Sequence, residues 1–422
     1  MSALWNSSPQ VTPTSRQPSD VLESRLFHRL LVLGNAAANW PPVVAVIPVA
    51  IAVGVTGIIW WVKTGDVIPS AWAGITLLLF IAADGLILLS LPRLRISFGP
   101  VAPQWYILAM PRLAVGCLLA FVTQWTGTTA ALAGLLTLNA IALFALLWGA
   151  LWEPSRVGVS RVTLHLHNPT SQATPVRLLH ISDVHVERIG RREETLLQRI
   201  RETHPDVILV TGDYINLSYV DDPTSRMHAR KFLEDLCDEA AGLSPPPPIY
   251  AVLGSPPVDR NSASLFEGLP IRLLRNEIAL VEAHPGCSLA LIGVDCSHDV
   301  QQDATQLEKL ASETPKGVPR ILMYHSPELM PLASRLGIEL YLCGHTHGGQ
   351  IRLPLYGALV TSSQLGKRYE MGLYCEGNTH LYVSRGVGLE GLCAPRVRFL
   401  CPPEIILWQL YCPARSTAAR PL

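Results

Sequence analysis

The sequence predicts an α/β domain that follows four membrane-spanning helices. Residues 40–152 carry very few charged side chains and contain four apolar runs, which predicts a membrane region. After Pro154, short apolar runs alternate with helical or loop segments, which predicts the α/β domain. A length of 422 residues suits two such parts. We therefore expect an N-terminal tail (1–40), a transmembrane region (41–153), the α/β domain (154–412) and a C-terminal tail (413–422).

The N-terminal tail is polar and rich in Ser, Pro and Arg, and it lacks the short apolar core and the cleavage site of a signal peptide. We expect it to be largely unfolded, with a helix only near Leu22–Leu33. Each apolar run that follows has about 20 residues, enough to cross roughly 30 Å of hydrocarbon. Tryptophans cluster near the run ends, as they do at membrane interfaces. The runs are Val43–Val62, Ala71–Leu91, Ile107–Trp125 and Ala130–Leu151.

The third run is the weakest, because Pro111 and Arg112 interrupt it. Arg112 is expected to reach the interface or to mark a shorter span. Asp84 lies inside the second run, and an intramembrane carboxylate is a functional candidate by default. A protonated or paired Asp84 within the bundle is the simpler interpretation. These two residues leave a transporter open as a third function, although a membrane anchor is the simplest role for the helices.

Basic residues predict the orientation. Six of the seven that flank the spans fall on one side of the four-span arrangement, and Lys63 falls on the other. Because positive loops stay inside, we expect both termini and the domain in the cytoplasm of a multi-pass membrane protein. Nine cysteines without regular spacing fit reduced thiols there. The six residues are Arg25, Arg29, Arg93, Arg95, Arg156 and Arg161.

The domain is expected to hold ten strands and two helices, with a β-rich end that indicates a second sheet. The helices are predicted at Arg191–Thr203 and Thr224–Ala241. The strands are predicted at Val157–His167, Val176–Ile181, Val207–Val210, Ile249–Leu253, Leu289–Val294, Arg320–Tyr324, Ile338–Leu342, Leu381–Ser384, Val397–Leu400 and Glu404–Leu410.

Metal-chelating side chains follow four of these apolar strands. RLLHIS leads into Asp183 and His185, VILVTG into Asp213, ILMY into His325, and LYLC into His345 and His347 of GHTHGGQ. In open α/β sheets the carboxyl ends of the strands converge on the ligand site, so these six residues should meet at one edge. Imidazole and carboxylate ligands suit Zn, Mn, Fe or Co.

His165 and His167 provide an internal comparison, because they have the same His-x-His spacing as His345 and His347. They lie in a strand whose polar residues alternate with apolar ones, which is typical of a solvated face. We do not expect them to bind a metal.

The motifs resemble those of calcineurin-like metallophosphoesterases. The resemblance covers roughly residues 175–410 and rests on Asp183-Val184-His185, Gly212-Asp213, YHSPE and GHTHGGQ. The last motif and the closing segment VSRGVGLEG are similar to a membrane-bound branch with enzymes like UDP-2,3-diacylglucosamine pyrophosphatase. The resemblance implies a four-layer αββα sandwich of two mixed sheets.

The resemblance also implies a hydrolase with two divalent metal ions. Asp183, His185 and His347 would hold the first ion, His325 and His345 the second, and Asp213 would bridge them. A metal-activated hydroxide would cleave a phosphodiester or diphosphate bond. The implied partners are a phosphorylated, lipid-linked substrate and the membrane lipids. The net charge of zero gives no reason to expect nucleic acid.

One motif departs from the family. Its members carry Gly-Asn-His at the end of the third strand, where this chain has Gly254 followed by Ser255 and Pro256. The missing Asn would complete the second metal site, and the missing His would assist the leaving group. Side chains that could reach back are Asp259, Asn261, Asp295 and His298. The alternative function is therefore a metal-binding regulatory relative with impaired catalysis.

Overall fold

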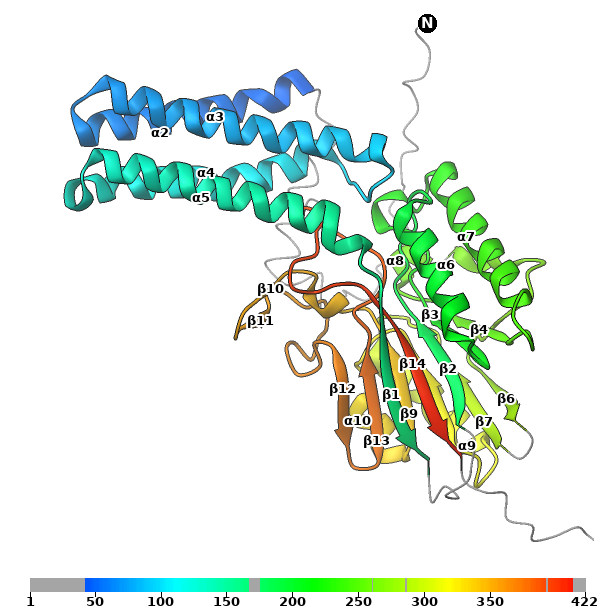
Figure 1. Cartoon of the computed structure of the whole chain (residues 1–422). Coiled ribbons are helices and arrows are strands. Elements are labelled where there is room, and N and C mark those ends of the chain that lie inside the picture. The colour runs from blue at the N-terminus through cyan, green and yellow to red at the C-terminus, as the bar shows by residue number, and fades with distance from the viewer. Residues whose placement is uncertain (1–41, 167–174, 260, 285–286, 392–393, 413–422) are drawn as a thin grey trace, which may run out of the picture.

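The computed structural model describes residues 42–166, 175–259, 261–284, 287–391 and 394–412. A bundle of four long helices leads into a domain of two sheets with helices on their outer faces (Figure 1). The predictions for the N-terminal tail, for His167 and for residues 413–422 lie outside the described residues.

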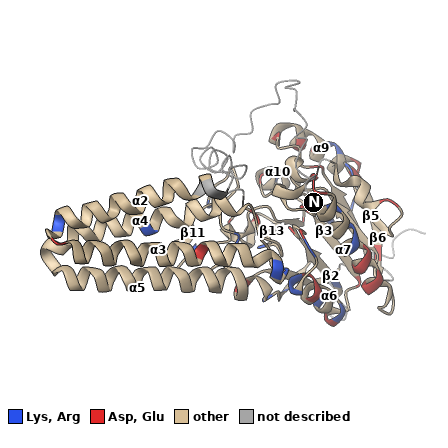
Figure 2. Cartoon of the chain, turned by 90° about the horizontal axis from the view of Figure 1, so that it is seen from above, with Lys and Arg blue, Asp and Glu red and all other residues tan. Residues whose placement is uncertain are grey.

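The four helices of the bundle coincide with the four predicted apolar runs. They are α2 (Pro42–Thr64), α3 (Val67–Ser90), α4 (Val101–Thr126) and α5 (Thr128–Leu147). Short turns continue α3 and α5 towards the domain: η2 (Leu91–Leu94), the π-helix η3 (Trp148–Trp152) and η4 (Glu153–Ser155). All four helices are long and apolar enough to span a membrane. Figure 2 shows few charged residues along the bundle, in contrast to the domain.

Arg112 neither reaches the interface nor shortens its helix, so that prediction is wrong. Helix α4 runs through Pro111, and Arg112 is buried. Its Nε donates to Asp84 Oδ2 at 2.6 Å and its Nη2 to Asp84 Oδ1 at 2.7 Å. Its Nη1 donates to Asn139 Oδ1 at 2.9 Å. Asp84 is thus paired inside the bundle, because a lone charge in hydrocarbon is costly.

Two six-stranded mixed sheets form the domain. The first has the order β1-β14-β2-β3-β4-β5, in which β14 pairs parallel with β1 and antiparallel with β2. The second has the order β12-β13-β9-β8-β7-β6, with antiparallel pairs at both edges. The strands of the first sheet are β1 (Gly158–His165), β2 (Val176–Ile181), β3 (Val207–Thr211), β4 (Ile249–Val252), β5 (Ile271–Leu273) and β14 (Glu404–Tyr411). Those of the second are β6 (Glu277–His284), β7 (Cys287–Gly293), β8 (Arg320–Met323), β9 (Leu340–Cys343), β12 (Gly372–Glu376) and β13 (Thr379–Val383).

The layers follow from three hydrophobic cores. One core packs the first sheet against α6 (Arg191–Thr203) and α7 (Pro223–Ala241). A second lies between the two sheets. The third packs the second sheet against α9 (Val300–Glu313) and α10 (Met330–Leu336). The predicted four-layer αββα sandwich is confirmed. Shorter elements are η5 (Leu217–Tyr219), α8 (Pro256–Asp259), η6 (Ser262–Phe266), η7 (His347–Gly349), β10 (Arg352–Leu353) and β11 (Gly357–Ala358).

Helix α6 has the predicted bounds, and α7 begins one residue earlier because Asp222 caps it by accepting from the amides of Thr224 and Ser225. The sequence analysis missed β5, β6, β12, α9 and α10. Its strand at Val397–Leu400 is wrong. That segment makes one bridge, from Phe399 to Ile351, while the Arg398 amide donates to Gly149 and the Leu400 amide to Glu153 at the end of the bundle.

The prediction of reduced thiols is wrong for two of the nine cysteines. Cys287 at the start of β7 and Cys412 after the end of β14 form a disulfide. These positions lie far apart in the sequence, but both side chains belong to the core between the sheets, where the two strands face each other.

The bundle is docked on the domain through buried carboxylates. Glu187 accepts from Ser97 Oγ at 3.1 Å and from the Phe98 amide at 2.9 Å, and it pairs with Arg396. Glu153 accepts from the amides of Leu400 and Cys401. The loop between α3 and α4 and the end of α5 are therefore held against the domain beside its metal-chelating residues.

Candidate metal centre

The six predicted site residues lie together where four strands end. Strands β2 and β3 of the first sheet lead into Asp183, His185 and Asp213, and β8 and β9 of the second sheet lead into the other three. All six side chains are buried. The carboxyl ends of the strands thus bring the residues to one edge of the sandwich, as parallel strands do.

Asp183, His185 and His347 form one group, whose ligand atoms lie within 4.8 Å of one another. His185 Nε2 is 3.0 Å from His347 Nε2, and Asp183 Oδ1 is 3.7 Å from the same His347 nitrogen. Three ligand atoms of different residues therefore point at a common centre.

Asp213 and His325 form a second group with Asp183, and His345 lies beside them. His325 Nε2 is 3.2 Å from Asp213 Oδ2 and 3.2 Å from His345 Nδ1. Asp213 Oδ2 also lies 3.5 Å from His185 Nε2 of the first group. One carboxylate oxygen therefore faces both groups.

Backbone carbonyls fix the orientation of the rings. His325 Nδ1 donates to Thr211 O at 2.8 Å, and His345 Nε2 donates to Ser362 O at 3.1 Å. His185 Nδ1 donates to Ile215 O at 3.3 Å. In each ring the other nitrogen therefore faces the centre, which is the arrangement of metal-binding histidines.

The backbone is unusual at the same residues. Five of the six have positive φ, between 45° and 68°: Asp183, His185, Asp213, His345 and His347. Non-glycine residues rarely adopt this conformation, and such strain is concentrated at functional sites. Gly344 lies directly behind Asp183, and a Cβ atom there would stand 1.9 Å from Asp183 Oδ2.

The electrostatics of the centre fit a bound cation. Burial raises the pKa of Asp213, but the charges of His325 and His185 outweigh burial and hold that pKa below its usual range. Burial lowers the pKa of His325, and Asp213 outweighs it and raises the pKa to about 10. Within the described part of the chain, Asp183 Oδ2 and His347 Nδ1 are buried without a hydrogen-bond partner. Two carboxylates and four imidazoles, with an orphaned carboxylate oxygen, form a donor set that divalent transition metals fit.

Ser255 stands where the family Asn would be. Its amide donates to Asp213 Oδ1 at 2.7 Å, and its Oγ lies 3.3 Å from His345 Nδ1. Pro256 follows at the start of α8, so no imidazole stands there. The Ser255 amide thus positions the Asp213 carboxylate, while Ser255 and Pro256 lack the side chains of the family motif.

Of the four residues expected to reach back, His298 has its ring 6.0 Å from that of His345. Asp259 accepts from the amides of Asp213 and Gly254 and so positions the loop. Asp295 pairs with Arg275, and the Asn261 carbonyl accepts from Arg226.

The sequence analysis missed Glu390. Its Oε2 lies 3.9 Å from His347 Nε2, and it forms a third close group with His185 and Asp213. Burial, together with the charges of Asp213 and Asp183, raises the pKa of Glu390 to about 8. The segment VSRGVGLEG, which carries Glu390, was the only signal for it. His165 in contrast is exposed on β1 and stacks on Tyr411, as expected of a residue outside the site.

The chain is similar in sequence to proteins of one family. Residues 176–349 match the family described as Calcineurin-like phosphoesterase. Phosphodiesterase YaeI of Escherichia coli is 31% identical over 248 residues, which cover 56% of this chain and 83% of that relative. The uncharacterized metallophosphoesterase YkuE of Bacillus subtilis is 29% identical over 56% of this chain and 78% of its own. UDP-2,3-diacylglucosamine pyrophosphatase LpxG of Chlamydia trachomatis is 23% identical over 65% of this chain and 95% of its own.

Proposed function

Because this chain belongs to the calcineurin-like phosphoesterase family, we propose that it is a membrane-bound, metal-dependent hydrolase of a phosphodiester or diphosphate bond. One observation carries the proposal: Asp213 Oδ2 faces His325 of one residue group and His185 of the other. A carboxylate between two sets of imidazoles and carboxylates is the arrangement that a two-metal site requires.

We assign Asp183, His185 and His347 to the first metal ion, His325 and His345 to the second, and Asp213 to both. The ions would be Mn, Fe, Co or Zn, and when bound they would clamp the phosphoryl group and supply hydroxide at neutral pH. The protein residues fix the ligand geometry in a buried site, where electrostatic stabilisation of transition-state charge is strong. Ser255 and His298 lie on the side of His345 and would contact the bound phosphate there.

The substrate proposed is phosphorylated and lipid-linked. The domain is docked on the end of the bundle, which holds the centre close to the membrane. The printed name of the Chlamydia trachomatis relative describes an enzyme that acts on a diacylated, diphosphate-containing substrate. A phosphoryl group attached to a lipid is thus the substrate class that the four-helix bundle favours. Membrane lipids would surround the bundle and form the second partner.

A second candidate is a metal-binding regulatory protein with little turnover. It is favoured by Ser255 and Pro256, since Pro256 has no group that transfers a proton. Two measurements on the purified full chain separate the candidates: the metal content per chain, and hydrolysis of nucleotide-diphosphate lipids and phosphodiesters with Mn, Co or Zn. Two metal ions and turnover support the hydrolase. Fewer than two ions and no turnover on any substrate support the regulatory protein.

We propose a cytoplasmic location for the domain, because it is docked beside Arg93 and Arg95, on the side that the basic loops place inside. One observation favours the opposite orientation: the Cys287–Cys412 disulfide is more typical of an oxidising compartment. The topology experiment described in the Discussion decides between the two.

A further inference from the structure

The hairpin of β10 and β11 carries an apolar tip that the domain does not cover. The fourteen residues from Leu353 to Gly366 contain no charged side chain. Leu355 is fully exposed, Tyr356 is 60% exposed, and three more apolar side chains are 40–47% exposed: Leu353, Leu359 and Val360. Soluble surfaces rarely gather large apolar side chains in this way unless something covers them.

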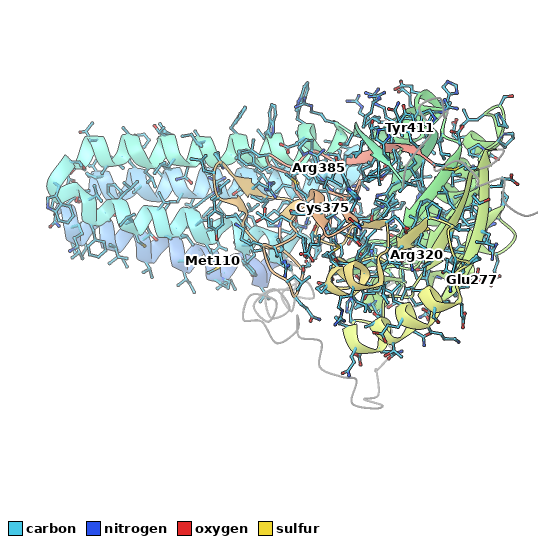
Figure 3. The ribbon with its side chains drawn as sticks, turned by 90° about the horizontal axis from the view of Figure 1, so that it is seen from below. Met110, Glu277, Arg320, Cys375, Arg385 and Tyr411 are labelled. Atoms are coloured by element: carbon cyan, nitrogen blue, oxygen red, sulfur yellow. A yellow bond between two sulfur atoms is a disulfide. The ribbon has the colours of Figure 1, made fainter. Side chains whose placement is uncertain are left out.

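The base of the hairpin contacts the domain-side ends of helices α3 and α5. Ile351, just before β10, packs on a core that includes Leu88 of α3, Leu146 of α5 and Ala150 of η3. Figure 1 shows the hairpin projecting from the domain in the direction in which the bundle extends from it. Figure 3 shows the same relationship from below, with exposed Met110 on the bundle and Glu277 at the opposite end of the domain.

The chemistry along the hairpin follows the polarity gradient of a membrane surface. Leu355 and Tyr356 lie in the turn between β10 and β11, where the hairpin would reach furthest towards hydrocarbon. Lys367 Nζ lies 3.7 Å from the centroid of the Tyr356 ring and donates to the Tyr356 carbonyl at 2.6 Å. Tyrosine and lysine are the residues that anchor a segment at the interface, the ring at the headgroup level and the amine towards water.

The base of the hairpin is attached to the metal centre. Arg352 donates to the carbonyl of Gly348, the neighbour of His347, at 2.8 Å. Gly349 lets the hairpin lie directly on this loop, since it has a φ of 82° and a Cβ atom there would meet Ala358 at 2.4 Å. Beyond β11, the carbonyl of Ser362 accepts from His345. The same short segment therefore connects the apolar tip to both histidines of the GHTHGGQ loop.

We propose that this hairpin inserts its tip into the membrane interface and delivers a lipid-anchored phosphoryl substrate from the bilayer to the metal centre. The lipid bilayer is the partner that would cover the apolar tip, because Ile351 at the base of the hairpin packs in the same core as the ends of α3 and α5. The insertion stands on the structure alone, whereas the delivery of substrate rests on the proposed function.

Insertion is tested by photocrosslinking of the full chain in lipid nanodiscs. A benzophenone amino acid at position 355 should crosslink to acyl chains. The matched control is position 280 on β6, because Leu280 is 57% exposed at the end of the domain far from the bundle. Lipid adducts at 355 and not at 280 support insertion. Equal lipid labelling at both positions, or crosslinks from 355 to a second copy of the chain, overturns it.

Delivery is tested with the double substitution Leu355→Ser with Tyr356→Ser. The substitution removes the apolar surface that the hairpin would bury in the bilayer. It should reduce turnover of a lipid substrate in vesicles by about tenfold or more, while turnover of a water-soluble phosphodiester stays unchanged. The control is Leu280→Ser with Met227→Ser, which removes similarly exposed apolar groups elsewhere. Equal loss on both substrates overturns delivery. No turnover of any substrate by the unsubstituted chain overturns the proposed function, and the crosslinking result then still decides insertion.

Discussion

Asp213 Oδ2 lies 3.2 Å from His325 Nε2, so that a carboxylate from the first sheet meets an imidazole from the second. Asp213 follows β3 and His325 follows β8, and 111 residues of sequence lie between Asp213 and His325. The candidate centre therefore exists only when the two sheets are packed face to face. Several predictions of its behaviour depend on this contact.

Replacement of Asp213 should be more damaging than replacement of any other single ligand, because its carboxylate faces both residue groups. We expect Asp213→Ala to abolish metal binding and hydrolysis. His165→Ala should change neither, since His165 is exposed on β1. Metal content and turnover of the purified full chain check this, and equal effects of the two substitutions would show that the site lies elsewhere.

Metal binding should release protons near pH 7. In the metal-free protein Asp213 raises the pKa of His325 to about 10, so that His325 holds a proton below that pH. A metal ion must displace this proton to bind the ring, and its affinity should therefore weaken as the pH falls. Calorimetric titration in two buffers of different ionisation enthalpy measures the release. Identical heats in both buffers would contradict the assignment of His325 as a ligand.

If the proposed function is right, the protein should prefer diphosphate bonds to alkyl phosphodiesters, because Pro256 replaces the family's proton-donating His. A general acid contributes roughly 10²–10⁴-fold when an alkoxide leaves. A phosphate monoester leaves without one, since its second pKa is about 6. Turnover of both substrate types under one metal tests this preference.

Repair of the motif gives a stronger form of the same test. Ser255→Asn with Pro256→His should raise activity on alkyl esters more than on diphosphates. If the unrepaired protein cleaves both equally well, another group supplies the proton, and His298→Gln then shows whether it is the imidazole beside His345. If it cleaves neither and repair restores nothing, the regulatory candidate is the better one.

The buried pair of Arg112 and Asp84 should be coupled in stability. Asp84→Leu leaves the arginine charge without its partner, which we expect to cost on the order of 3 kcal/mol. Asp84→Leu with Arg112→Leu should recover most of this loss, because both charges are then removed. Thermal unfolding of the detergent-solubilised full chain measures the cycle. Additive losses would mean that the two side chains do not interact.

The topology prediction is tested by a reporter fused after Leu422. The basic residues that flank the spans predict a cytoplasmic signal. A signal from the opposite side would overturn the four-span orientation and would agree with the Cys287–Cys412 disulfide.

The sequence by itself determined the four long apolar helices and the local setting of the candidate metal ligands. Helices α2 to α5 are readable because hydrocarbon demands about 20 apolar residues in a row. Helix α6 has a strong local pattern and has the predicted bounds. Asp183, His185, Asp213, His325, His345 and His347 are recognisable because each follows a short apolar strand. These signals are local, so a single stretch of sequence contains them.

Only the tertiary structure decided which distant groups meet. Glu390 reaches the centre from a loop, seven residues beyond the end of β13, and His298 is distinguished from Asp295 only by where its ring points. The pairing of Arg112 with Asp84 and of Cys287 with Cys412 depends on elements that pack across the bundle and across the sandwich. The physical reason is that local periodicity specifies which face of an element is buried, whereas the partner on the other side of that face is chosen by the packing of the whole chain.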